Sequence, residues 1–181
     1  MTNNIPPSPF RTLDSRIAWE CPWFRIRQDD VILPNGSPGV YNTLLHPGAV
    51  WIVPLTTEGE IVLIHQFRYA GNDWYWELPA GALVPGRSPL ESAQVELQEE
   101  IGGVAQEWQE VGWFYCSNGT TNEKAWVFVA SGVEMGETAH EPTEVMTIHR
   151  RPVAEAVAMA RNGQMTDGPS ALALLLSEKF L

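Results

Sequence analysis

The chain has 181 residues, which is the length of one compact domain with a small appendage. Hydrophobic residues make up 44% and charged residues 18%, and this balance excludes wholesale disorder and a long exposed coiled coil. The formal net charge of -11 argues against broad nucleic-acid binding and against docking on anionic membranes, so any phosphate chemistry would need metal ions or locally placed cations.

The sequence also indicates in which compartment of the cell the protein is expected. The segment from Met1 to Phe10 lacks the apolar stretch of a signal peptide, and no run approaches the roughly 20 apolar residues that cross a membrane. Cys21 and Cys116 lie far apart without metal-ligand or disulfide spacing, so we expect reduced thiols. Together these features predict a cytoplasmic protein with no membrane partner.

The first third of the chain predicts a flexible arm at residues 3–9, followed by an antiparallel β meander over 17–45. We place Trp23, Phe24 and Ile26 in one strand and residues 31–33 in the next. The Pro- and Gly-containing pairs within 34–39 predict the turns between strands.

The middle of the chain predicts buried sheet strands and one well-defined helix. Two β-branched apolar runs, 49–55 and 60–67, flank a turn, and a short aromatic strand over 74–78 ends at a Pro-Ala-Gly sequence. Ser88 and Pro89 open a helix whose apolar face recurs through Ile101, and two glycines end it.

The last third predicts strands over 108–116, 125–130 and 145–149, with a loop at 117–124, and helices over 153–161 and 169–180. Strands followed by one central helix, more strands and more helices indicate an α+β fold with a mixed central sheet.

Three glutamates gather on one side of the central helix. Glu96 and Glu100 are four residues apart, and Glu99 lies three beyond Glu96. Like charges at this spacing destabilise a helix unless a cation offsets them, and oxygen-only ligands favour Mg²⁺ or Mn²⁺. The alternative is a solvated acidic face.

The surrounding pattern decides between these alternatives. From Gly81 to Gly102 the chain resembles the sequence box of the Nudix hydrolases without insertion. The matching positions are Gly81, the three helical glutamates, Leu97 and Gly102. Two positions depart from that box: Arg87 stands where the family has a glutamate, and Val95 where it has an arginine. We hypothesise that Arg87 supplies the missing cation.

The resemblance implies a Nudix-type α/β/α sandwich and a metal-dependent cleavage of a nucleoside diphosphate linked to another group. It makes Glu96, Glu99 and Glu100 the metal-binding carboxylates, with the carbonyl of Ala80 as a further ligand, and gives Glu100 a catalytic role. In similar ADP-ribose pyrophosphatases a general base comes from a loop here at 136–144. There Glu144 is the first candidate and Glu141 the second.

The resemblance extends to the branch that acts on ADP-ribose and related nucleoside diphosphate sugars. Candidates for stacking on a base are Trp51, Trp74, Tyr75 and Trp76, and packing in the core or in a dimer is the alternative for each of them. The resemblance implies that Arg68 contacts phosphate or ribose and that three further residues bind substrate. These three are Glu77, Gly81 and Gly119. Asn118 stands where the family commonly has a proline, which leaves other diphosphate sugars, such as a GDP-sugar, open.

In that branch the N-terminal strands pair or swap between subunits. The resemblance therefore implies a dimerising segment at 1–46, a catalytic domain at 47–181 and a homodimer. The expected activity is hydrolysis of a nucleoside diphosphate sugar to a nucleoside monophosphate and a sugar phosphate. The alternative is a nucleotide-sugar binding or sensing module of the same fold with weak or no turnover.

Overall fold

The computed structural model describes residues 6–139 and 145–181. Its contacts divide the chain into two compact units. The first, which we call the N-terminal unit, comprises Met1–Pro47 and Ser117–Glu123; the second, the main unit, comprises Gly48–Cys116 and Lys124–Leu181.

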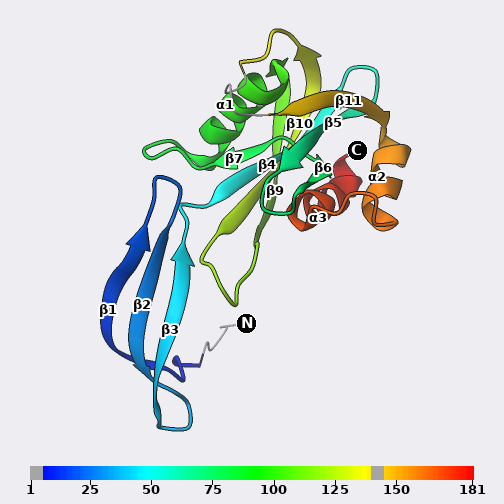
Figure 1. Cartoon of the computed structure of the whole chain (residues 1–181). Coiled ribbons are helices and arrows are strands. Elements are labelled where there is room, and N and C mark those ends of the chain that lie inside the picture. The colour runs from blue at the N-terminus through cyan, green and yellow to red at the C-terminus, as the bar shows by residue number, and fades with distance from the viewer. Residues whose placement is uncertain (1–5, 140–144) are drawn as a thin grey trace. The chain divides into compact units, whose positions relative to one another are not determined.

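The N-terminal unit contains the predicted antiparallel meander, which is confirmed. Its strands pair in the order β1-β2-β3 and run over Arg11–Glu20, Arg25–Ile32 and Pro38–Leu45 (Figure 1). The segment 117–123 lies beside β3, where the Leu44 N–H donates to the Thr120 carbonyl at 3.0 Å. The Tyr41 hydroxyl donates to the Gly119 carbonyl, also at 3.0 Å.

The predicted positions of the meander's strands are wrong in three respects. β1 begins at Arg11, before the predicted start of the meander at residue 17. Trp23 and Phe24 lie between β1 and β2, not in a strand, and the Cys21 N–H closes this turn on the Phe24 carbonyl at 3.0 Å. Residues 38 and 39 begin β3 and form no turn. The Asn35 side chain accepts the Ser37 N–H at 3.0 Å, so the chain has already reversed before Pro38, and proline is tolerated as the first residue of a strand.

The main unit is built on an eight-stranded mixed sheet in the order β11-β5-β4-β10-β8, with β6 paired to β5, β7 to β4 and β9 to β10. β4 and β10 pair in parallel, and the described pairing of β4 with β5 is one residue pair, Leu55 with Ile61. The sheet therefore opens between β4 and β5, and β6 and β7 pair with their separated strands. The bounds are β4 Ala49–Thr56, β5 Glu60–Arg68, β6 Asp73–Glu77, β7 Ala80–Ala82, β8 Gly103–Val104, β9 Glu107–Tyr115, β10 Lys124–Met135 and β11 Met146–Pro152.

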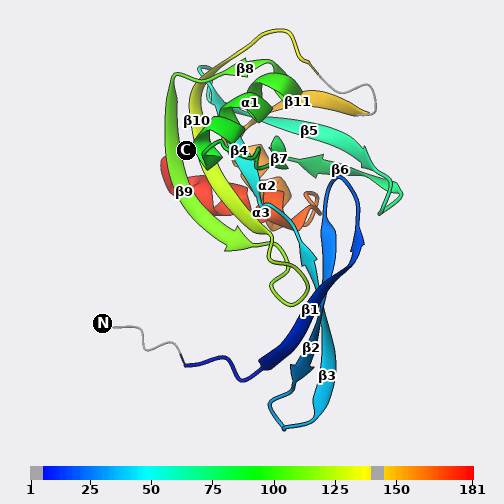
Figure 2. The ribbon, with the colours of Figure 1, turned by 90° about the vertical axis from the view of Figure 1, so that its left-hand side faces the viewer.

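Helices cover both faces of this sheet, which confirms the α/β/α sandwich (Figures 1 and 2). On one face α1, Pro89–Ile101, buries Leu97 and Ile101 against Val50 and Ile64. The second face carries the core cluster that includes Leu174. Its helices are α2, Val153–Arg161, and α3, Gly168–Ser177, and a 3₁₀ turn follows at Glu178–Phe180.

Both ends of α1 are fixed as the sequence predicts. Ser88 and Glu91 form a reciprocal capping box, which satisfies backbone N–H groups of the first turn. Gly102 ends the helix with a φ of 64°, a conformation that glycine adopts without strain. The Gly102 carbonyl accepts the Gly136 N–H at 2.8 Å, so the loop after β10 is attached to the end of this helix.

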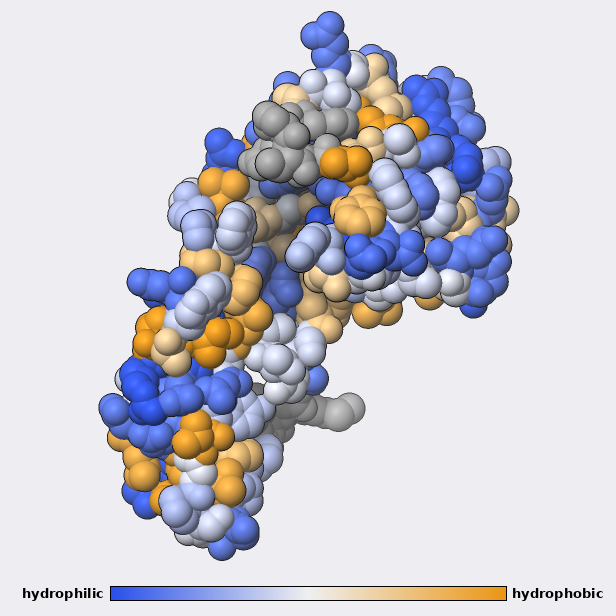
Figure 3. Space-filling model, in the orientation of Figure 1, coloured by the Kyte–Doolittle hydropathy of each residue, from blue (hydrophilic) through white to orange (hydrophobic). Residues whose placement is uncertain are grey.

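The N-terminal unit exposes large apolar side chains on its strands (Figure 3). Among them are Leu13, Ile17 and Trp19 of β1 and Val40 of β3, each between 44% and 56% exposed. Monomeric proteins bury most contiguous apolar surface, so these strands are suited to contact a protein partner. None of the helices in the described part of the chain is long and apolar enough to cross a membrane.

Candidate active site

The opening between β4 and β5 is spanned by a short connection from β6 to β7. Leu78 and Pro79 of this connection are buried. The Ile52 N–H of β4 donates to the Pro79 carbonyl at 2.9 Å, and the Ala80 N–H donates to a carboxylate oxygen of Glu100 at 2.9 Å. The connection is thereby held between the sheet and α1.

The glutamates of α1 differ in their surroundings. Glu100 is 5% exposed and faces Ala80, and Glu96 is half-buried against Gly81. A Cβ atom at Gly81 would overlap the Glu96 carboxylate, so glycine is what allows that carboxylate to approach the β7 backbone. Glu99 is exposed, and its backbone carbonyl accepts the Ala139 N–H at 2.9 Å.

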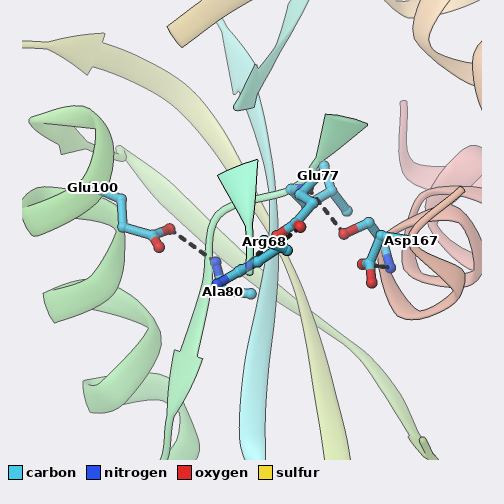
Figure 4. A network of polar contacts seen from close by, with 7 residues as sticks. Arg68, Glu77, Ala80, Glu100 and Asp167 are labelled. Carbon is cyan, nitrogen blue, oxygen red and sulfur yellow. Dashed lines mark hydrogen bonds and ion pairs between the residues drawn. The ribbon is translucent and has the colours of Figure 1, made fainter. Parts of the chain in front are cut away.

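An ion pair between the exposed Arg68 and the buried Glu77 lies next to this carboxylate group (Figure 4). The Arg68 guanidinium donates through Nε and Nη2 to the two carboxylate oxygens of Glu77, at 2.9 and 2.5 Å. These bonds raise the pKa of Arg68 above its ordinary value, and the nearby charges of Glu100 and Asp167 act in the same direction. Arg68 is therefore a fixed cation close to Glu100.

An open pocket of about 380 Å³ adjoins the ion pair. It is lined by two aromatic side chains, the ion pair, the Ala80 backbone region and the residues before α3. The lining residues are Trp51, Arg68, Ala70, Tyr75, Glu77, Ala80, Thr166 and Asp167. A pocket with aromatic walls, one cation and several polar groups can hold a sugar or a base beside a phosphate.

The donor set beside α1 fits a hard divalent cation. Among residues 6–139 and 145–181, no three histidine, cysteine or acidic side chains form a ready-made metal cage. Mg²⁺, however, is usually held by one or two carboxylates together with waters and substrate phosphates. Glu96 and Glu100 beside the Ala80–Gly81 backbone supply such an incomplete oxygen shell.

Three predicted residues, Gly119, Glu141 and Glu144, are not among the described residues of the main unit. Gly119 belongs to the N-terminal unit. Glu141 and Glu144, the candidate general bases, fall outside the described residues.

The two departures from the Nudix box lie on and before α1. Val95 is half-buried, and Arg87 is exposed at the start of the helix. Hydrogen bonds from Ser88, with a contribution from the charge of Arg87, lower the pKa of Glu91. Arg87 lies two residues before α1, and Glu96 follows Pro89 by about 10 Å of helical rise. Arg68 is a cation that the structure places near Glu100, and the hypothesis about Arg87 stays a prediction.

The site residues expected from the sequence did not include those at the start of α3. Asp167 caps this helix by accepting the Ser170 N–H at 2.9 Å, and the Ser170 hydroxyl accepts the Leu78 N–H at 3.0 Å. The sequence signal was available, because Asp167 precedes a proline at the first helical turn, as a helix cap does. Its proximity to Arg68 depends on the tertiary fold and has no local signature.

Comparisons with known proteins give matches over most of the chain. Residues 45–170 match the NUDIX domain, and residues 10–44 match the nucleoside diphosphate sugar hydrolase N-terminal domain. An ADP-ribose pyrophosphatase of Mycobacterium tuberculosis is 34% identical over 87% of this chain and 78% of its own. The ADP-ribose pyrophosphatase of Bacillus subtilis is 32% identical over 81% and 80%. The crystal structure of an ADP compounds hydrolase has a TM-score of 0.83 at 22% identity, covering 95% of this chain and 94% of its own, which shows the shared fold.

Proposed function

The chain belongs to the Nudix family, and on this premise we propose that it is a divalent-metal-dependent hydrolase of a nucleoside diphosphate sugar such as ADP-ribose. Water adds across the phosphoanhydride, which gives a nucleoside monophosphate and a sugar phosphate. The observation that carries the proposal is that Glu96 and Glu100 of α1 meet the Ala80–Gly81 backbone beside the Arg68–Glu77 pocket.

We propose that Mg²⁺ or Mn²⁺ is held by the carboxylates of Glu96, Glu99 and Glu100 and by the Ala80 carbonyl. When bound, such a cation neutralises phosphate oxygens and lowers the pKa of a bound water. The chain's own contribution is orientation. Glu100 is buried and accepts the Ala80 N–H, so its carboxylate keeps one direction relative to the β7 backbone.

The pocket supports a role for Arg68 in binding the diphosphate. Two of its five N–H donors are used by Glu77, and its side chain is 47% exposed, so other donors are accessible to phosphate oxygens. We propose that Glu77 fixes this fork, that Trp51 stacks on the substrate, and that Gly81 and Gly119 complete the binding residues. Glu144, or else Glu141, is proposed as the general base.

One assay separates the hydrolase from a binding or sensing module. ADP-ribose, a GDP-sugar and other diphosphate sugars are incubated with the protein and either Mg²⁺ or Mn²⁺, and products are resolved by anion-exchange chromatography. The proposal expects metal-dependent release of a nucleoside monophosphate from at least one of them. Thermal stabilisation by a nucleotide sugar without product formation would favour the sensing module.

We further propose that the protein forms a homodimer through the segment 1–46, while 47–181 carries the chemistry in the cytoplasm. The proposal is supported by the exposed apolar side chains of β1, which include Ile17 and Trp19. Replacing Ile17 with Asp places a charge among them. We expect sedimentation analysis to show dimers for the wild type and a shift toward monomers for Ile17→Asp, and a wild-type monomer would contradict the proposal.

A further inference from the structure

The connection from β6 to β7 is held at three backbone groups by three different elements. The Leu78 N–H donates to the Ser170 hydroxyl of α3, the Pro79 carbonyl accepts from Ile52 of β4, and the Ala80 N–H donates to Glu100 of α1. Two of these partners lie on the faces of the sheet, one on each side. The position of the Ala80 backbone thus depends on α3 as well as on α1.

Ser170 is itself fixed. It is 0% exposed, and its N–H donates to the carboxylate of Asp167, the cap of α3, at 2.9 Å. Leu78, which donates to Ser170, is also 0% exposed, so water cannot replace the hydroxyl as acceptor without a rearrangement. A rigid chain of two hydrogen bonds therefore joins the start of α3 to the connection.

Asp167 caps α3 and also lines the pocket. It lines the pocket together with Arg68 and Glu77, and its charge adds to the charges that hold Arg68 protonated. Figure 4 shows Asp167 on one side of the Arg68–Glu77 pair and Glu100 with Ala80 on the other. The first turn of α3 thus faces the candidate site from the side opposite the carboxylates of α1.

We infer that Ser170, held by Asp167, is a positioning residue for the cation site: it fixes the 78–80 connection so that the Ala80 carbonyl and the Glu100 carboxylate keep their relative placement. This inference rests on the proposed function, because it takes these two groups as metal ligands. Groups that orient metal ligands through hydrogen bonds typically change metal affinity by about 10- to 100-fold when they are removed.

The test compares two serines of the same helix. Ser177 is also 0% exposed, but its hydroxyl donates within α3, to the Ala173 carbonyl at 2.7 Å. Ser170→Ala and Ser177→Ala each remove one buried hydroxyl, whereas only Ser170→Ala leaves the Leu78 N–H without its acceptor. Binding of Mn²⁺ alone is measured by calorimetry for both variants and the wild type, alongside the melting temperature.

We expect Ser170→Ala to weaken Mn²⁺ binding by about tenfold or more, while Ser177→Ala binds as the wild type does. Ser170→Cys, which keeps the volume but offers a weak acceptor, is expected to weaken binding in the same direction and serves if Ser170→Ala does not fold. Equal Mn²⁺ affinity in the wild type and the Ser170 variants would overturn this inference alone. A wild type that binds no Mn²⁺ would overturn both the inference and the proposed metal site.

Discussion

Gly81→Ala is the substitution whose effect can be worked out most directly from the structure. Gly81 has no positive φ, so alanine fits its backbone conformation, but the added Cβ would lie well inside 3.0 Å of the Glu96 carboxylate, closer than real Cβ contacts come. The carboxylate must retreat by roughly 1 Å, and a misplacement of that size costs about 100-fold in rate. The fold should survive, because the obstacle is the mobile end of one side chain.

The assay for this variant is the Mg²⁺ concentration that gives half-maximal hydrolysis of the best substrate, measured with the melting temperature. We expect that concentration to rise by about 10- to 100-fold. Gly59→Ala is the control, because Gly59 has a φ of 78° and open space around it, so alanine there costs about 1–2 kcal/mol of backbone strain without touching the site. Wild-type metal dependence in Gly81→Ala would contradict the proposed placement of the Glu96 carboxylate against β7.

Three further predictions concern the binding residue, the helix cap and pH. Arg68→Lys loses the two-bonded fork to Glu77, and we expect KM to rise by about tenfold in steady-state assays; an unchanged KM would contradict its proposed role. Ser88→Ala removes the capping box and should cost about 1 kcal/mol, seen as a melting temperature lower by about 2–4 °C, and an unchanged value would contradict the cap's contribution. Burial, together with the charges of Arg151 and His65, lowers the pKa of His149 below its ordinary value of 6.5. As the pH falls, the unfolded chain therefore takes up this proton more readily than the folded protein does. The free energy of unfolding should decrease as the pH drops below about 6.5. His149→Gln should reduce that slope in urea titrations across pH, and an unaltered slope would contradict this assignment.

Local sequence signals predicted the elements with strong periodicity. Helix α1 could be placed because Ser88 and Gly102 mark its ends and its apolar face is regular. β4 and β5 could be placed because each is a mostly apolar run rich in valine and isoleucine. The three helical glutamates could be grouped for the same reason, since helical spacing alone brings them to one side.

Features that depend on tertiary contacts could not be predicted. β7 and β8 are three and two residues long and exist only because β4 and β10 offer them backbone partners. The hydrogen bond from the Leu78 N–H to the Ser170 hydroxyl joins residues 92 positions apart, and no local sequence pattern predicts it. Arg68 could be proposed as a phosphate contact from its family resemblance, but its pairing with Glu77 and its place beside Glu100 required the sheet to open between β4 and β5.

The proposed function requires that carboxylates of α1 hold the divalent cation used in the hydrolysis. Glu100→Gln tests it most directly, because the amide keeps the size of the side chain and an oxygen that can accept the Ala80 N–H, while the charge is lost. Glu110→Gln, an exposed change on β9, is the control. We expect Glu100→Gln to stay folded, to bind Mn²⁺ at least about tenfold more weakly and to lose most hydrolysis of the best diphosphate sugar. Hydrolysis and Mn²⁺ binding at wild-type levels would contradict the proposed function.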